Sequence, residues 1–192
     1  MNTPQVKKIV VAVTGASAMV FLHSFLQVLE KEAIEVHGIC SESGAKVLQL
    51  ERGISYTELP AVTKWFDSKD FAAPPASGSS GYDAMVVLPC SMGTLAAIAA
   101  GISSTLVHRA ADVTLKENKK LLLVTRETPL NRTHLKNMLA VHDAGATICP
   151  PHPGFYLNPT SIEDAATTFS WRLGDQLGLK MKGRERWEGI DV

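Results

Sequence analysis

The chain has 192 residues, of which 45% are hydrophobic, and its 19 Lys and Arg residues balance 19 Asp and Glu residues. This size and apolar content suit one domain over residues 1–192, with a tail from about 180 to 192 that is flexible or packed on a neighbouring subunit. The neutral charge balance argues against nonspecific nucleic-acid binding, and no apolar run approaches the roughly 18 residues that cross a bilayer. Because the start, MNTPQVKK, also lacks the apolar core of a signal peptide, we expect a cytoplasmic protein.

Strand and helix patterns alternate along the chain. Short β-branched or apolar runs predict strands at Ile9–Thr14, Val36–Cys40, Met85–Leu88, Leu121–Thr125 and Ala146–Cys149. Amphipathic stretches between them predict helices over about 18–32, 43–52, 92–101, 104–117, 131–144 and 161–177. This alternation indicates βαβ units and a parallel sheet, which places the chain in the doubly wound α/β class. Ligands of that class bind beyond the carboxyl ends of the strands.

One segment, 68–82 (SKDFAAPPASGSSGY), interrupts the alternation. Its Pro, Gly and Ser content is typical of a flexible linker. However, it lies inside the alternating pattern and directly precedes a strand, and its hydroxyls and free amides can line a polar ligand. We therefore favour a functional loop over a linker.

Small and hydroxyl-bearing residues follow three of the predicted strands. A tight turn of this kind lets backbone amides and a helix N-terminus approach a phosphate. The sequence lacks the G-x-G-x-x-G pattern, since Ala18 stands where the glycines would continue, and this favours FMN over NAD. The alternatives are ordinary short turns, a simple helix N-cap at Ser41 and close packing of the alanine-rich helix. The residues are Gly15, Ala16 and Ser17 after the first strand, Ser41 after the second, and Ser91, Gly93 and Thr94 after the third.

Charged residues end the fourth predicted strand. Arg126 and Glu127 follow its apolar run at once, so we expect them to face the binding crevice. Lys116, on the preceding helix, adds a second cation if the fold brings that helix end over the same crevice. Such a cluster suits a phosphate or another anion. Arg109 lies near the same helix face as Lys116, and a salt-bridged surface helix is the alternative for both.

The last third of the chain adds two candidates. The rigid segment PPHPGFY would bring Tyr156 to the crevice, although a structural turn is the alternative. Arg172 lies in the final predicted helix, where a lone arginine is usually solvated. The histidine spacings match no metal-binding pattern, so no metal site is expected. Three cysteines end strand-like runs, which indicates reduced, buried thiols: Cys40, Cys90 and Cys149.

Five motifs in register resemble those of the UbiX-like flavin prenyltransferases, a family formerly called aromatic acid decarboxylases. They are PPASGSS, LPCSMGTLAAIAAG, RAADVTLKE, RETPLNRTHLKNM and PPHPGFY. The likeness extends from Lys8 to Trp187. It implies a Rossmann-like or flavodoxin-like flavoprotein of three α/β/α layers, which assembles into a homo-dodecamer with FMN at subunit interfaces.

The resemblance also implies an activity. Family members join the dimethylallyl group of dimethylallyl monophosphate to N5 and C6 of reduced FMN without a metal, and the prenylated FMN serves a UbiD-type decarboxylase. By motif, the residues that would hold FMN are Gly15, Ala16, Ser17, Ser41, Ser91, Met92, Gly93, Thr94 and Arg126. Those that would surround the prenyl donor are Phe71, Arg109, Lys116, Arg126, Glu127, Tyr156, Arg172 and Trp187.

These residue types suit the implied chemistry. Breaking an allylic carbon–oxygen bond expels phosphate, so cations and the Tyr156 phenol would stabilise the leaving charge, while aromatic faces would line the cationic allyl fragment. By the same resemblance, Ser17 and Glu51 lie near the flavin N5, where a proton must leave and return. Glu127 would orient the cations or exchange a proton, and Lys116 would act on the leaving phosphate.

Several positions depart from the family pattern. Ala18 and Leu22 stand where the family has glycine, and Phe21 stands where it has tyrosine. Phe71 stands where tryptophan is common, and Glu42 where lysine is common. None of these departures removes a phosphate-binding group, and they bear on the shape of the pocket and on the preferred prenyl donor. Two other functions stay open on the sequence: an FMN-binding paralogue that delivers cofactor without catalysis, and a flavin-dependent decarboxylase that acts directly on an aromatic acid.

Overall fold

The computed structural model describes residues 6–32, 34–181, 183, 184 and 189. Its parallel strands form one six-stranded sheet in the order β3-β2-β1-β4-β5-β6. The chain winds outward from β1 to β3, returns to β4 and continues to β6, so the doubly wound α/β prediction is confirmed. The strands are β1 (Lys8–Val13), β2 (Glu35–Cys40), β3 (Val62–Asp67), β4 (Ala84–Cys90), β5 (Lys120–Thr125) and β6 (Thr147–Ile148).

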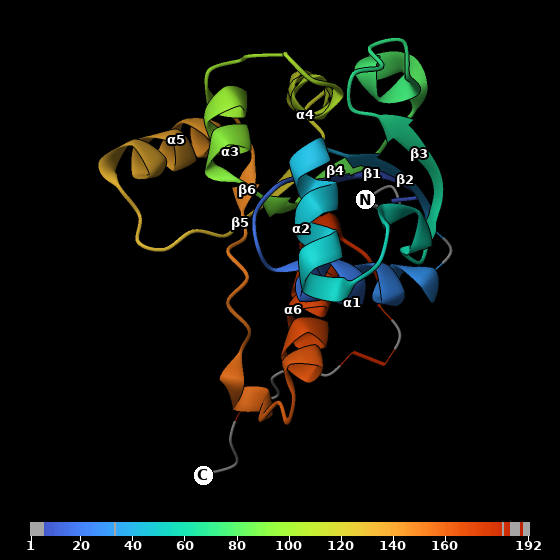
Figure 1. Cartoon of the computed structure of the whole chain (residues 1–192), viewed down its shortest axis with the longest axis vertical. Helices are drawn as coiled ribbons and strands as arrows, with labels where there is room; N and C mark the ends of the chain where they lie inside the picture. Colours follow the sequence, from blue (N-terminus) through green and yellow to red (C-terminus); the bar gives the residue numbers. More distant parts are fainter. Residues whose placement is uncertain (1–5, 33, 182, 185–188, 190–192) are drawn as a thin grey trace.

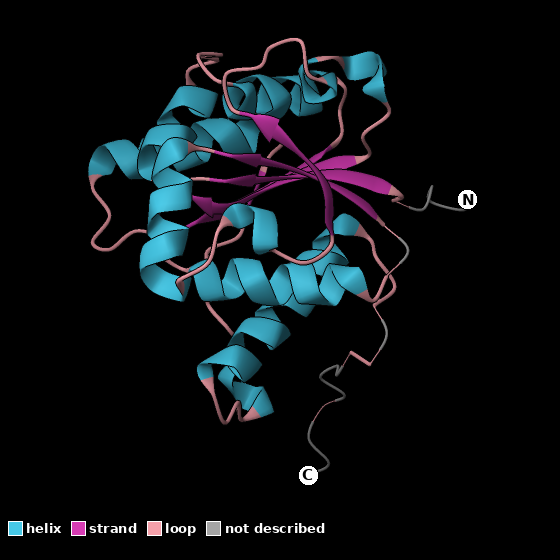
Figure 2. Ribbon diagram, turned by 45° about the vertical axis from the view of Figure 1, so that its right-hand side comes forward, coloured by secondary structure: helices cyan, strands magenta, loops and turns pink. Residues whose placement is uncertain are grey.

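Helices cover both faces of the sheet and complete three layers (Figure 2). The helices are α1 (Met19–Glu30), α2 (Glu42–Arg52), α3 (Met92–Ala99), α4 (Leu106–Lys116), α5 (Arg132–Asp143) and α6 (Ile162–Leu177). Most of them begin at a side chain that accepts an amide hydrogen bond: Ser41, Ser91, Thr105, Asn131 and Ser161. Among the described residues, none of the helices combines the length and apolarity needed to span a membrane.

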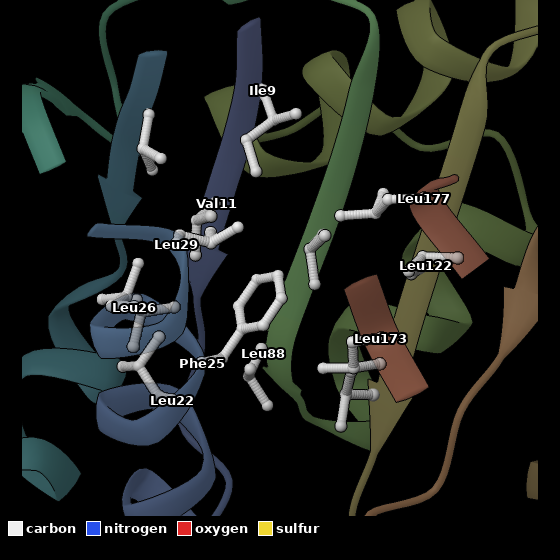
Figure 3. Close-up of a cluster of buried hydrophobic side chains, with 14 of the residues drawn as sticks. Ile9, Val11, Leu22, Phe25, Leu26, Leu29, Leu88, Leu122, Leu173 and Leu177 are labelled. Carbon is white, nitrogen blue, oxygen red and sulfur yellow. The ribbon is translucent and has the colours of Figure 1, made fainter. Parts of the chain in front are cut away.

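The two faces of the sheet carry separate hydrophobic cores. Alternate residues of β1 point to opposite faces, so Ile9 and Val11 pack with α1, α2 and α6, whereas Val10 packs with α3, α4 and α5. Figure 3 shows the first core, which contains Phe25 of α1 and Leu173 of α6. Because the central strands are buried on both sides, their sequences are continuous apolar runs.

Strand β3 was not predicted from the sequence. It mixes exposed polar side chains with partly buried Trp65 and buried Phe66, because it is an edge strand and only one side of it pairs. Trp65 of β3 packs over Gly38 of β2, where a Cβ would lie 2.3 Å from the indole ring. The edge strand is thus fixed by an aromatic side chain that fills the space left by a glycine.

The segment 68–82 is an ordered loop, so the linker interpretation is wrong. It crosses from β3 to β4 through two short 3-10 turns and packs against α4. The Leu106 amide donates to the Ser68 carbonyl at 2.7 Å, and Arg109 Nε donates to the Ala76 carbonyl at 3.1 Å. At its far end, Tyr82 Oη shares a 2.7 Å hydrogen bond with His37 Nδ1. The loop therefore covers the sheet face where a crossover helix would otherwise lie.

Candidate functional site

The carboxyl ends of β1 and β4 are joined at the point where the winding of the sheet reverses. Thr14 Oγ1 donates to the Pro89 carbonyl at 2.8 Å and accepts from the Ser91 amide at 2.9 Å. These bonds place the turn after β1 directly beside the N-terminus of α3. A topological switch point is where open α/β sheets bind ligands, so the polar turns predicted from the sequence lie at the expected edge.

Helix α1 begins at an unusual cap. Ala18 has φ 107° and ψ 32°, and its side chain offers no hydrogen bond to the free amides of the first turn. Instead, Glu51 Oε2, from the end of α2, accepts from the Met19 amide at 2.9 Å and the Ala18 amide at 3.2 Å. Its carboxylate also pairs with the Ser17 hydroxyl. Glu51 is therefore built into the first turn, which sequence pattern alone would not reveal.

Glu51 is held in its ionised form. Partial burial alone would raise the pKa of its carboxyl, but hydrogen bonds from Ser17, Met19 and Ala18 and the charge of Arg126 outweigh burial, and the pKa lies below its ordinary value. The carboxylate also occupies the amides that the sequence analysis assigned to a phosphate. An anionic group of a ligand therefore fits better at the N-terminus of α3, whose first turn contains no acidic residue, than at that of α2, whose first turn contains Glu42.

Arg126 joins this cluster from the end of β5. Its Nε donates to the Ser17 carbonyl at 3.4 Å, and its charge lowers the pKa of Glu51. The neighbouring Glu127 is exposed, and its Oε1 accepts from the Thr128 amide at 3.0 Å. Ser17, Glu51 and Arg126 thus come together from three separate elements, as the resemblance implies.

Lys116 lies elsewhere, and its expected place over the same crevice is not observed within one chain. It ends α4, and β5 begins shortly afterwards at Lys120, which pairs with Ala84 at the amino ends of the strands. A crossover helix runs antiparallel to its strands, so the carboxyl edge is roughly one strand length, about 20 Å, away. Lys116 instead pairs with Glu117 against the loop at Gly78.

The remaining donor-site candidates are also spread out. Arg109 is held on the loop side by Ala76 and by Asp112, whose Oδ2 lies 2.7 Å from Arg109 Nη1. Phe71 lies on the loop and is about half exposed, at 48%. Trp187 lies outside the described residues.

Tyr156 is carried on a segment that leaves the body of the molecule. In Figures 1 and 2 the chain between β6 and α6 runs away from the sheet before α6 returns to it. Tyr156 is 54% exposed there and Phe155 is 74% exposed. Arg172 lies on α6, close enough to Cys149 at the start of this segment for its charge to act on the thiol. An extended arm with exposed aromatic rings is suited to contact with another copy of the chain.

The edge of the sheet also fits a bound flavin. Thr125 Oγ1, at the end of β5, is buried and has no hydrogen-bond partner among the described residues, which is costly unless a ligand or water satisfies it. A Cβ built on Gly93, in the first turn of α3, would meet nothing within 4 Å, so the space before that helix is open. Thr125 was not predicted as a site residue, although it is a hydroxyl-bearing residue that ends an apolar strand beside Arg126.

Metal and cysteine chemistry find no support in the described part of the chain. No group of three or more His, Cys, Asp or Glu side chains there could hold a metal ion. The three cysteines are free, but only Cys90 is buried, while Cys40 and Cys149 are partly buried. Burial raises the pKa of Cys40 and Cys90 to about 12 and that of Cys149 to about 11, so the thiols stay protonated at neutral pH.

Comparison with known proteins identifies relatives over nearly the whole chain. The family model described as Flavoprotein matches residues 2–168. The mitochondrial flavin prenyltransferase of Saccharomyces cerevisiae is 44% identical over 98% of this chain and 78% of its own length. A crystal structure of AnUbiX in complex with FMN and dimethylallyl pyrophosphate covers 97% of this chain and 100% of its own, with a TM-score of 0.93 and 40% identity. A dodecameric FMN-dependent UbiX-like decarboxylase from Escherichia coli O157:H7 covers 95% of this chain and 100% of its own, with a TM-score of 0.90 and 40% identity.

Proposed function

Because the chain belongs to the Flavoprotein family, among the UbiX-like flavin prenyltransferases, we propose that it prenylates reduced FMN. The donor is dimethylallyl monophosphate, and the new bonds form at N5 and C6 of the flavin without a metal. The observation that carries the proposal is the cluster of Ser17, Glu51 and Arg126 at the switch point of the sheet. The cluster lies at the edge where folds of this class bind ligands, which supports proton transfer by Ser17 and Glu51 and anion binding by Arg126.

The chain's own residues have distinct roles in this proposal. Bound FMN supplies the nucleophilic nitrogen and carbon that accept the prenyl group. Glu51, ionised and hydrogen-bonded to Ser17, accepts and returns the proton through that hydroxyl. Arg126 holds the phosphate of the donor as its negative charge develops, and Thr125 offers its unused hydroxyl to the bound ligand.

The donor site is completed by neighbouring copies of the chain. Lys116 lies about one strand length from Arg126 within one chain, so both can touch one phosphate only if they come from different copies. The exposed arm that carries Tyr156 supports the same arrangement. We propose a homo-dodecamer, the assembly described for the UbiX-like decarboxylase of Escherichia coli O157:H7.

A single reaction tests the activity. Purified protein is incubated without oxygen, with reduced FMN and a metal chelator, and with either dimethylallyl monophosphate or dimethylallyl pyrophosphate. We expect the mass of FMN plus one dimethylallyl unit with the monophosphate, and a clear preference over the pyrophosphate. Bound FMN without product would instead support a non-catalytic delivery protein. Loss of carbon dioxide from an aromatic acid by this protein alone would support a direct decarboxylase.

The product is destined for a UbiD-type decarboxylase in the cytoplasm. A prenylated flavin is a finished cofactor, so it has to be handed to an enzyme that uses it. Adding the reaction mixture to a UbiD-type apoenzyme should produce decarboxylase activity, and mixtures that lack either the donor or this protein should not. Cell fractionation tests the location, because the yeast relative is named as mitochondrial.

A further inference from the structure

Leu179, Met181 and Arg184, which follow α6 in the sequence, lie against that helix. Gly178 ends α6 with φ 83°, and the Leu179 amide donates to the Gly174 carbonyl at 2.9 Å. Leu179 is buried in the core beneath α6, and Met181 lies against Gly174, where a Cβ would be 2.6 Å from Met181 Cε. Leu179 and Met181 are therefore packed on the helix that carries Arg172.

Asp175 connects Arg184 to Arg172. Arg172 Nη1 donates to Asp175 Oδ2 at 3.0 Å, and Arg184 Nη1 donates to the other carboxylate oxygen. The side chains of Asp175 and Arg184 are only 16% and 10% exposed, whereas that of Arg172 is 59% exposed. One shielded carboxylate thus holds two guanidiniums, and only that of Arg172 is presented to solvent.

We propose that Asp175 and Arg184 are positioning residues that hold Arg172 for the phosphate of the prenyl donor. The inference rests on the proposed function, because Arg172 is assigned to that phosphate through the family resemblance. A flexible arginine loses side-chain entropy when it binds a ligand, and fixing one edge of its planar fork beforehand reduces that loss. Two guanidiniums on one carboxylate also leave a net positive charge, so the pair with Asp175 does not cancel the attraction for an anion.

The readout is donor affinity. Arg172 would contact the phosphate in the bound donor as well as in the transition state, so loosening it should raise KM with little change in kcat. A purely structural role would instead lower the melting temperature and the amount of active protein. The two outcomes differ in steady-state kinetics at saturating reduced FMN with dimethylallyl monophosphate titrated.

Three substitutions in the full-length chain form the test. Asp175→Asn should raise the KM for dimethylallyl monophosphate about tenfold, and Arg184→Gln about threefold, with kcat within about twofold of wild type. Asp175→Glu should recover most of the loss, because it restores the charge. The matched control is Glu163→Gln on the same helix, whose partner is Arg52 and which should leave KM unchanged.

Unchanged KM in folded Asp175→Asn and Arg184→Gln would overturn the proposal. If Asp175→Asn does not fold, Arg184→Gln decides, because it leaves the Arg172–Asp175 pair intact. If the wild type forms no product, the proposed function fails first. Calorimetric titration of wild type and Arg184→Gln with dimethylallyl monophosphate then still tests the positioning: weaker binding to the variant supports it, and equal binding contradicts it.

Discussion

At the scale of single residues, Ala18 carries a strained backbone. Its φ of 107° lies in the region that an L-residue with a Cβ enters at a cost of about 1–2 kcal/mol, and the family pattern has glycine here. We expect Ala18→Gly to raise the free energy of unfolding by about 1 kcal/mol, because glycine removes the clash but gains freedom in the unfolded chain. Chemical denaturation measures the change.

The control for Ala18→Gly is the same substitution in a regular helix. Ala97 lies in the interior of α3, where nothing requires a positive φ. Ala97→Gly should therefore lower the free energy of unfolding by about 1 kcal/mol. If the free energy of unfolding rises for Ala18→Gly and falls for Ala97→Gly, the backbone conformation of Ala18 is the cause of the gain. A loss of stability at both positions would show that the strain is absent in solution.

Glu51→Gln separates catalysis from cofactor binding. If Glu51 returns the proton near the flavin, the amide should lower kcat by about 10²–10⁴-fold while FMN still binds. Product formation at saturating donor and flavin fluorescence titration measure the two effects. A variant with wild-type kcat would remove Glu51 from the mechanism.

The effect of Glu51→Gln on the stability of the fold should depend on pH. The pKa of Glu51 is lower in the folded chain than its ordinary value, so the ionised carboxylate stabilises the fold above the unfolded-state pKa of about 4.3. That contribution disappears as the pH falls through the folded-state pKa. The melting temperature of Glu51→Gln should therefore lie below that of wild type at neutral pH and converge with it in acid.

Some residues of this cluster are predictable from the sequence and others are not. Arg126 directly follows an apolar strand run and Ser17 lies in the turn after another, so the class of fold already places them at one edge. Glu51 lies on an exposed, polar helix end, and only the family resemblance selects it. Thr125 was absorbed into the apolar run before Arg126, because its unused hydroxyl becomes visible only when the surrounding packing is known.

At the scale of elements, the edge strand β3 depends on one contact across the sheet. A Cβ on Gly38 would collide with the Trp65 ring, so Gly38→Ala should push the indole away. We expect the free energy of unfolding to fall by about 1–3 kcal/mol. Trp65 fluorescence should shift to longer wavelength at the same time, as the ring gains contact with water.

A second substitution, Trp65→Leu, tests whether the effect of Gly38→Ala comes from the indole ring. Replacing Trp65 by leucine in the Gly38→Ala background removes the ring that the new methyl group meets. The combined loss should be smaller than the sum of the two single losses, since the substitutions act on the same contact. Additive losses would show that the glycine is required for another reason.

Buried strands were predicted from the sequence more successfully than the exposed edge strand. Strands β1, β4 and β5 are buried on both faces and read as continuous apolar runs, so their positions were predicted within a few residues. Strand β3 escaped because an edge strand mixes polar and apolar side chains. The loop 68–82 was ambiguous because its order comes from α4 and from His37, which lie far from it in sequence.

At the scale of the whole molecule, the spacing of charged residues along the sequence did not predict which of them lie close together in space. Lys116 and Arg126 are close along the chain, but β5 separates them in space, so their closeness in sequence was misleading. The proposed sharing of the site between copies rests on other features: exposed aromatic rings such as Phe155, and cations distant from the cluster to which they are assigned.

Mixing two inactive variants tests whether the site is shared. We expect Lys116→Ala and Arg126→Ala each to lose activity as separate proteins. If one phosphate site takes Lys116 from one copy and Arg126 from another, co-expression of the variants leaves both residues intact in about a quarter of the sites. About that fraction of wild-type activity should return in the mixed oligomer, measured per protomer after tandem-tag purification.

The control for mixing uses two residues that meet within one chain. Arg126 and Glu51 lie in the same cluster of a single copy, so every copy in a mixture of Arg126→Ala and Glu51→Gln has one of the two broken. That mixture should stay inactive, although it contains the same number of intact side chains as the first. Recovery in both mixtures would mean that subunit contact alone restores activity, and recovery in neither would place Lys116 outside the donor site.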